Sequence, residues 1–313
     1  MRLRNLRYNL NRNVLLADVP VVSVGNLTLG GTGKTPLVAW IARWLRQRDV
    51  RVTIVSRGYG AQRGEPNDEA LELEQRLPDV PHLQNADRVA AARTAIEEFD
   101  CQVVLLDDGF QHRRLARDLD IVLLDACEPF GFGHVFPRGL LREPVSGLKR
   151  ADVVVLSRAD MIEPERRVQI RREVGRLAPH AAWVEVRHAP ERWLSSSGAE
   201  QPIAALAGQP VAAFCGLGNP AGFRHTLGEC GSRVQAFREF PDHHLYDRAD
   251  VESLVDWAAK LDVAAVACTH KDLAKLELDR LGDRPLWALV VGIEFLDGQD
   301  EFEQQLAMLL PPE

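Results

Sequence analysis

The segment of residues 21–36 constrains the fold of this chain more than any other. It reads VVSVGNLTLGGTGKTP, a β-branched run that breaks into glycines and then into a lysine, a threonine and a proline. This order predicts a buried strand, a phosphate-binding loop and the start of a helix. In such a loop, backbone N–H groups close on phosphate oxygens, the lysine adds a cation and the threonine hydroxyl can bind Mg²⁺. The predicted phosphate-binding residues are Gly30, Gly31, Thr32, Gly33, Lys34 and Thr35, the last of them also a metal ligand.

The loop departs from the full pattern G-x-x-x-x-G-K-[ST], because Thr28 stands where that pattern begins with glycine. The sequence after Pro36 nevertheless supports the prediction. Apolar residues recur there at helical spacing, so strand, loop and helix come in the required order. These residues are Leu37, Val38, Ile41, Trp44 and Leu45.

The length of 313 residues predicts about two domains. The formal net charge of -7 argues against nucleic acid as the main partner, because nucleic-acid-binding domains usually carry a basic excess. The five cysteines form no C-x-x-C pair and fit a reducing cytosol. No stretch approaches the roughly 18 consecutive apolar residues of a membrane-spanning helix.

Predicted strands alternate with predicted helices along the chain. This alternation indicates a doubly wound, parallel α/β sheet, in which ligands bind at the carboxyl ends of the strands. The strands are expected at 51–55, 103–107, 119–125, 151–156, 211–215, 263–268 and 286–295, and the helices at 86–99, 163–177, 251–261 and 301–310. Arg57 follows one of these strands and is therefore either a residue of the nucleotide edge or a solvated loop arginine.

A second chemical landmark is the pair Asp107 and Asp108 at the end of an apolar strand. A phosphate-loop enzyme needs such a carboxylate to hold Mg²⁺ opposite Thr35. Adjacent like charges cost free energy unless a cation or hydrogen-bond donors compensate them. We therefore predict both aspartates as metal ligands, with Gln111 and His112 as further candidates for contacts to substrate, phosphate or metal.

Other polar positions leave two interpretations open. Arg142 lies in a loop framed by glycine and proline, which suits a phosphorylated substrate or a surface ion pair. Asp68 opens a helical pattern and by position would be a helix cap. His243 and His244 follow an aspartate and suit metal binding or acid–base and orienting work.

The basic N-terminus also allows two interpretations. Four arginines occur within residues 1–14 without an acid, while leucines recur there at helical spacing. The segment is either a short amphipathic helix on anionic lipid or a helix that packs on its own domain. The arginines are Arg2, Arg4, Arg7 and Arg12.

With these residues assembled, the chain resembles the tetraacyldisaccharide 4′-kinases, the lipid A 4′-kinase family of Gram-negative bacteria. The resemblance extends from about residue 19 to the last predicted strand and includes a threonine at the place of Thr28. The blocks that carry it are residues 23–36, 56–60, 68–69, 107–112, 142–144, 216–220, 240–243 and 269–272. The family often has glutamate where this chain has His270.

The resemblance implies transfer of the ATP γ-phosphate to the 4′-hydroxyl of a tetraacylated glucosamine disaccharide 1-phosphate, the lipid A precursor. It also implies Mg²⁺ as a cofactor, a peripheral position on the cytoplasmic face of the inner membrane, and a monomer. By position, Asp68 looks like the family's catalytic base, with His243 as its partner. The alternative is a GTPase or metallochaperone of the related doubly wound class, in which Asp107 would serve a conformational switch. Leu29 stands where that class often has lysine.

The fold that the resemblance implies is α/β, with a phosphate-loop NTPase-like α/β/α sandwich and a smaller α/β/α domain joined by a two-stranded linker. We expect the kinase domain at 1–181, the linker strands at 182–188 and 289–296, and the second domain at 189–288. The closing helix, 297–313, is expected to pack on the kinase domain.

Overall fold

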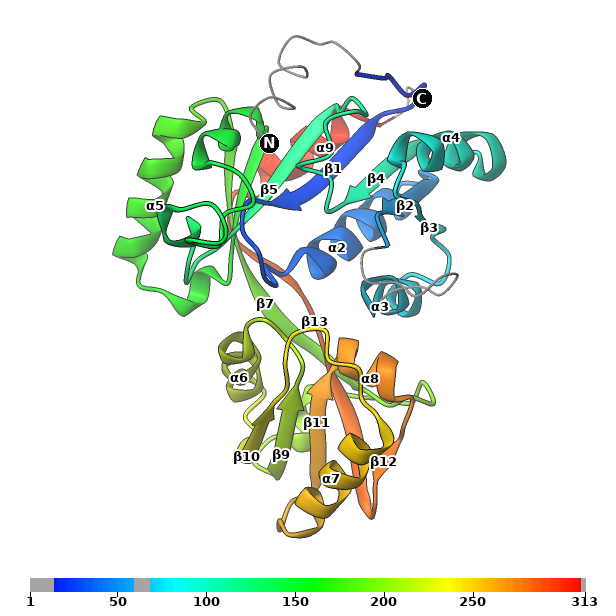
Figure 1. Cartoon of the computed structure of the whole chain (residues 1–313), viewed down its shortest axis with the longest axis vertical. Helices are drawn as coiled ribbons and strands as arrows, with labels where there is room; N and C mark the ends of the chain where they lie inside the picture. Colours follow the sequence, from blue (N-terminus) through cyan, green and yellow to red (C-terminus); the bar gives the residue numbers. More distant parts are fainter. Residues whose placement is uncertain (1–13, 59–67, 311–313) are drawn as a thin grey trace. The chain divides into compact units, whose positions relative to one another are not determined.

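The computed structural model describes residues 14–58 and 68–310, apart from the side chain of Glu69. The basic segment 1–13 and its predicted helix lie outside the described residues. The chain divides into two compact units, described separately below (Figure 1). Unit 1 comprises residues Met1–Arg187 and Ile293–Glu313, and unit 2 comprises His188–Gly292.

Unit 1 is built on parallel strands in the order β7-β6-β5-β1-β4-β2-β3. β1 lies between β4 and β5. The chain runs from β1 toward β2 on one side and from β4 to β5 on the other, so the order of the strands reverses at β1. Ligands bind at such a point in doubly wound folds. The strands are β1 (Val21–Asn26), β2 (Val52–Ser56), β3 (His82–Gln84), β4 (Val103–Asp107), β5 (Leu119–Asp125), β6 (Val153–Ser157) and β7 (Ala182–Leu194).

Helices cover both faces of this sheet because successive strand residues point to opposite sides. Val22, Val24 and Leu105 pack with α2, α3 and α9, whereas Val104 and Leu106 pack with α4. α5 covers another part of the second face, against Val122 and its neighbours. The helices are α2 (Lys34–Arg46), α3 (Asp68–Arg76), α4 (Arg88–Phe99), α5 (Pro164–Leu177) and α9 (Gln299–Ala307). Short 3₁₀ turns occur at η1 (Gly131–Gly133), η2 (Val145–Arg150) and η3 (Ala159–Met161).

Two glycines let the segment after β4 lie against β1. A Cβ at Gly25 would come 2.6 Å from the Cβ of Phe110, and one at Gly109 would come 2.6 Å from Ser23 Oγ. Any side chain at either position would therefore push the two segments apart. The glycines thus place Asp107 and Asp108 beside the strand that ends in the phosphate loop.

Unit 2 has its own α/β/α arrangement. Parallel strands β10, β9, β11 and β13 are neighbours in that order. α7 and α8 pack on Phe214 and Val266, while α6 packs on Val211 and Ala267 from the other face. The elements are β8 (Glu200–Gln201), η4 (Ile203–Leu206), β9 (Pro210–Cys215), α6 (Pro220–Glu229), β10 (Arg233–Glu239), α7 (Arg248–Ala259), β11 (Ala265–Thr269), α8 (His270–Leu276), β12 (Arg280–Leu281) and β13 (Arg284–Asp297).

The predicted α/β class and most predicted elements are confirmed. The sequence analysis did not identify β10, because this strand has no regular alternation of apolar and polar residues and is largely exposed at the end of the strand order. The described part of unit 1 includes Phe302 and Leu306 of α9 in its core. β7 and β13 are the strands along which the chain passes between the two units.

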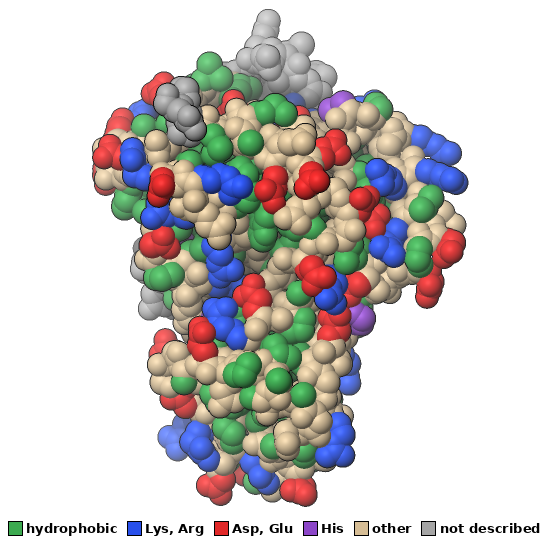
Figure 2. All heavy atoms as spheres, turned by 180° about the vertical axis from the view of Figure 1, so that it is seen from behind, with side chains coloured by type: hydrophobic (Ala, Val, Ile, Leu, Met, Phe, Trp, Pro, Cys, Tyr) green, Lys and Arg blue, Asp and Glu red, His purple; other side chains and the backbone are tan. Residues whose placement is uncertain are grey.

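The surface mixes charges of both signs. On the face drawn in Figure 2, basic and acidic side chains are interspersed over each unit rather than gathered by sign. Among the described residues, none of the helices is both long and apolar enough to cross a bilayer.

A partly buried histidine in unit 1 predicts sensitivity to acid. His82 lies 2.9 Å from Ser56 Oγ through Nε2, and burial lowers its pKa to about 4. An unfolded histidine titrates near pH 6.5, so the unfolded chain binds more protons between the two values and stability falls as the pH drops through this range. The loss from this residue is expected to reach about 3 kcal/mol by pH 4.

The measurement for His82 is the melting temperature between pH 4.5 and 7 for the wild type and His82→Gln. We expect a flatter pH dependence for the variant, because glutamine does not titrate. Parallel curves for the two proteins would contradict the assignment.

Candidate active site

The loop between β1 and α2 has the backbone of a phosphate-binding loop. Lys34 and Thr35 are the first two residues of α2, and the free N–H groups of a helix N-terminus favour anions. Gly33 caps the helix with φ 81°, and Gly30 has φ 99°, conformations that favour glycine. A Cβ at Gly30 or Gly31 would meet nothing within 4 Å, so the glycines leave open space over the loop.

Polar side chains from neighbouring strands hold the loop in place. Asn26 donates from Nδ2 to Thr32 Oγ1 at 3.1 Å, and Ser157 donates from Oγ to the Thr32 carbonyl at 2.7 Å. Arg158 donates to the Gly31 carbonyl at 2.5 Å. Ser157 and Arg158 thus support the backbone of the loop from the end of β6.

A second segment borders the loop on its other side. The Leu29 N–H donates to the Leu140 carbonyl at 2.7 Å, and the Arg142 N–H donates to the Leu27 carbonyl at 2.7 Å. These bonds place Arg142 beside the phosphate loop. Its side chain is therefore available to the same site as Lys34.

Arg158→Ala is expected to loosen the phosphate loop and to destabilise unit 1. The guanidinium also pairs with Asp125 at 2.6 Å, and both side chains are largely buried. Removing it takes the cationic partner from the largely buried carboxylate of Asp125, which costs about 3 kcal/mol. We expect a lower melting temperature and a higher KM for ATP, measured by thermal unfolding and steady-state kinetics. An unchanged KM at a temperature where the variant is folded would show that the loop does not depend on Arg158.

The predicted carboxylates lie at the carboxyl end of β4. Asp107 is its last residue and is 2% exposed. Asp108 has φ 54° and accepts two hydrogen bonds of 2.7 Å from Arg142, while Lys34 Nζ lies 3.5 Å from its Oδ1. Burial opposes ionisation of Asp108, but the charges of Lys34 and Arg142 outweigh it and hold its pKa below the ordinary value. Lys34, Asp108 and Arg142 thus form one ion cluster beside the phosphate loop.

Gln111 and His112 follow the two aspartates, and Gln111 links this segment to β1 and to Glu143. Gln111 donates from Nε2 to the Asn26 carbonyl at 2.8 Å and to Glu143 at 3.2 Å. Burial, together with the charges of Arg88 and Arg117, lowers the pKa of His112 to about 4. His112 is therefore a neutral imidazole at neutral pH.

Arg88 is a buried arginine that the sequence analysis did not single out. It is the first residue of α4 and is 7% exposed. Burial and the charge of Arg57 lower its pKa, whereas Asp108 and Asp107 raise it. Arg57 itself is exposed, directly after β2. The only sequence signal for Arg88 is an arginine at the start of a helix, where basic residues are disfavoured.

The two predicted catalytic residues belong to different units. Asp68 is the first residue of α3 in unit 1 and is half-buried. His243 lies in unit 2 with φ 58°, and its side chain is half-exposed. The joint role of Asp68 and His243 stays a prediction.

Several blocks of unit 2 that are distant in sequence meet around Asp272. Its carboxylate accepts hydrogen bonds from the Gly216 N–H at 3.1 Å, from Tyr246 at 3.0 Å and from Thr269 Oγ1 at 2.6 Å. Burial raises the pKa of Asp272 despite these donors. The network fixes the segment around His243 against the start of α8.

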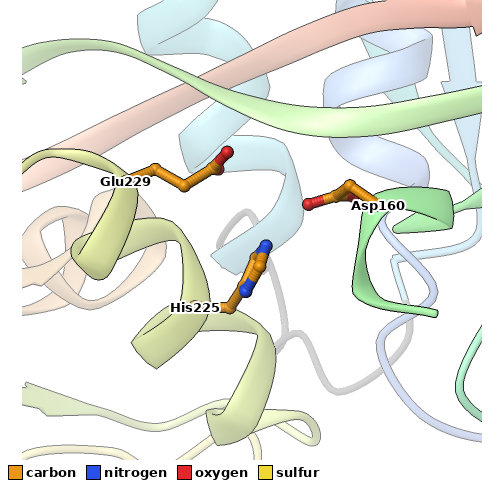
Figure 3. A group of neighbouring side chains, drawn as sticks. All are labelled: Asp160, His225 and Glu229. Atoms are coloured by element: carbon orange, nitrogen blue, oxygen red, sulfur yellow. The ribbon is translucent and has the colours of Figure 1, made fainter. Parts of the chain in front are cut away.

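His225 and Glu229 lie one turn apart on α6 and project from the same side of that helix (Figure 3). Asp160, the third labelled residue, belongs to η3 of unit 1. Two side chains of one helix do not complete a zinc site, which takes three or four protein ligands. We assign no metal to them.

Comparison with known proteins identifies the family. A profile described as tetraacyldisaccharide-1-P 4′-kinase matches residues 1–311. The tetraacyldisaccharide 4′-kinase of Anaeromyxobacter dehalogenans strain 2CP-C is 44% identical over 311 residues, covering 93% of this chain and 82% of that protein. The corresponding kinase of Halothermothrix orenii is 38% identical, covering 93% and 84%.

A solved structure agrees with these sequence matches. The "apo" form of LpxK from Aquifex aeolicus, crystallised in complex with ATP, has a TM-score of 0.75 and 28% identity, covering 99% of this chain and 95% of its own. The match extends over nearly the whole length of both chains. The chain therefore belongs to the tetraacyldisaccharide 4′-kinase family.

Proposed function

We propose that this protein transfers the γ-phosphate of ATP to the 4′-hydroxyl of a tetraacylated glucosamine disaccharide 1-phosphate in lipid A biosynthesis. The observation that carries this proposal is the phosphate loop with Lys34, next to Asp107 and Asp108 at a topological switch point. The identity of the acceptor is inferred from membership of the tetraacyldisaccharide 4′-kinase family. The ATP complex of the Aquifex relative supports ATP as the donor.

The residues of unit 1 suit a nucleotide triphosphate. Backbone N–H groups of residues 30–35 would bind the β- and γ-phosphates, and Lys34 would neutralise them. On binding, the γ-phosphate would compete with Asp108 for Lys34 and Arg142. Arg142 is thus available to a phosphate oxygen as charge develops during transfer.

The oxygen donors at this edge fit Mg²⁺. Thr35 in the first turn of α2 and Asp107 at the end of β4 are hard ligands of the kind Mg²⁺ takes in phosphate-loop enzymes. Asp108 would have to give up its two hydrogen bonds from Arg142 before it could bind the same ion. When bound, the ion would neutralise the phosphates and help align them.

We infer that Asp68 is the catalytic base and that His243 is its partner, on the strength of the family resemblance. The Asp68 carboxylate would take the proton of the 4′-hydroxyl as that oxygen bonds to the γ-phosphorus. The bond between the γ-phosphorus and the bridging oxygen breaks, and ADP leaves with that oxygen. The products are the 4′-phosphate ester, ADP and a protonated Asp68.

The two compact units support an assignment of domains. We propose that unit 1 is the kinase domain, that β7 and β13 contain the linker strands, and that unit 2 is the second α/β domain. The protein is proposed to act as a monomer on the cytoplasmic face of the inner membrane. Leu15 and Leu16, which are 41% and 87% exposed, follow the basic N-terminal segment and suit contact with lipid.

The test is transfer of ³²P from γ-labelled ATP to the purified lipid disaccharide 1-phosphate. We expect labelled lipid with ATP and much less with GTP, and loss of the label when EDTA removes Mg²⁺. Hydrolysis without labelled lipid, or a preference for GTP, would instead favour the GTPase or metallochaperone alternative.

A further inference from the structure

Lys271 of unit 2 lies against the imidazole of His243. Its Nζ is 3.2 Å from His243 Nδ1, although the residues are 28 positions apart in sequence. Lys271 is 8% exposed, an unusual burial for a lysine. The contact involves the one histidine that the proposed mechanism uses.

The chemistry of this contact determines where the imidazole carries its proton. An ammonium group has three donors and no acceptor, so His243 Nδ1 must be the acceptor. The proton of the neutral ring then resides on Nε2, because the hydrogen bond at one ring nitrogen sets the state of the other. His243 therefore presents Nε2–H as a donor toward a carboxylate or phosphate oxygen.

A nearby carboxylate does not replace this contact. Asp242 Oδ1 lies 3.9 Å from Lys271 Nζ, and Asp242 Oδ2 lies 3.9 Å from His243 Nε2. Both distances exceed hydrogen-bond range. Asp242 instead accepts the His243 backbone N–H at 3.1 Å and thereby fixes the turn.

Lys271 is itself held rigidly. It is the second residue of α8, which Thr269 caps by accepting the Asp272 N–H at 3.1 Å. The Asp272 carboxylate ties the same turn to Gly216 and Tyr246. Lys275, one turn further along α8, donates to the His244 carbonyl at 2.9 Å. α8 therefore contacts residues 243–244 at two points: Lys275 binds their backbone and Lys271 contacts the His243 imidazole.

We propose that Lys271 is a positioning residue that holds His243 in the Nε2–H tautomer for phosphoryl transfer. This inference rests on the proposed function, in which His243 assists Asp68. It assigns a role to the lysine of the block at residues 269–272, where this chain has His270 instead of the more frequent glutamate. A merely structural lysine would affect folding but not the tautomer.

The first experiment is a double-mutant cycle with Lys271→Met, His243→Ala and the double variant, measured by ³²P transfer to the lipid. Lys271→Met is expected to lower kcat by roughly 10–100-fold, the same loss that follows removal of the hydrogen-bond partner that orients a metal-binding histidine. KM for ATP should stay near the wild-type value. In the His243→Ala background, Lys271→Met should cause no further loss of kcat. Lys260→Met replaces an exposed lysine of the same unit and serves as the matched control.

The second experiment records ¹⁵N NMR spectra of the histidine side chains in the full chain, with His243 assigned by its absence from His243→Ala. The wild type should show a protonated Nε2 and an unprotonated Nδ1. Lys271→Met should shift His243 toward a mixture of tautomers, while Lys260→Met should not.

Three outcomes separate the inference from the function on which it rests. An equal kcat loss from Lys271→Met with and without His243, or an unchanged tautomer, would overturn the role of Lys271. Normal kcat in His243→Ala would overturn the role of His243, and the proposal with it. If no lipid is labelled by the wild type, the proposed function fails, and the NMR spectra still decide whether Lys271 sets the tautomer.

Discussion

Replacement of Asp68 by asparagine is expected to lower kcat for lipid phosphorylation by about 10²–10⁴-fold, the usual contribution of a general base. Asparagine preserves the size of the side chain but cannot accept the proton of the 4′-hydroxyl. Because Asp68 opens α3 and is not part of the phosphate loop, KM for ATP should change little. The measurement is the initial rate of ³²P transfer at saturating ATP and lipid.

Two further variants give this experiment its controls. His243→Ala should also lower kcat more than it weakens nucleotide binding, as expected for a partner of the base. Asp79→Asn changes an exposed carboxylate of unit 1 that pairs with Arg46, and should leave kcat unaffected. If Asp68→Asn and His243→Ala each weakened ATP binding as much as they slowed transfer, both residues would be structural or would bind the nucleotide.

Lys34→Ala is expected to lower kcat/KM for ATP by about 10²–10³-fold, the loss typical of one preorganised donor to a developing charge. The lysine side chain is only 10% exposed, so its ammonium acts in a partly desolvated site. Without Lys34, Arg142 is the one cation of the ion cluster that still pairs with Asp108. Arg142 would then be held more tightly by Asp108 and would be less available to phosphate.

The appropriate comparison for Lys34→Ala is Lys149→Ala, which removes an exposed lysine of the same unit. This control variant should retain wild-type kcat/KM. ATP affinity measured by calorimetry, alongside the kinetics, separates binding from transfer. Wild-type kcat/KM in Lys34→Ala would contradict the assignment of residues 30–35 as the phosphate loop.

The phosphate loop and the α/β class were predictable because they depend on local chemistry. Glycines at positions of positive φ, a lysine and a threonine at a helix start, and alternating buried strands and helices all appear within short windows of sequence. The place of Asp107 and Asp108 at the carboxyl end of an apolar strand was predictable for the same reason, whereas their role as metal ligands stays a prediction. Asp68 and His243 came from family resemblance, because their local surroundings indicate only a helix start and a turn.

By itself, then, the sequence determined the order of strand, phosphate loop and helix, the two acids opposite it, and the family. The tertiary structure decided which polar groups meet: Arg142 with the Asp108 carboxylate, Arg158 with the Gly31 carbonyl, and Lys271 with the His243 imidazole. These pairs are separated by between 28 and 127 positions. No periodicity or motif spacing relates residues that far apart, because only the packing of strands and helices brings their side chains within hydrogen-bond distance.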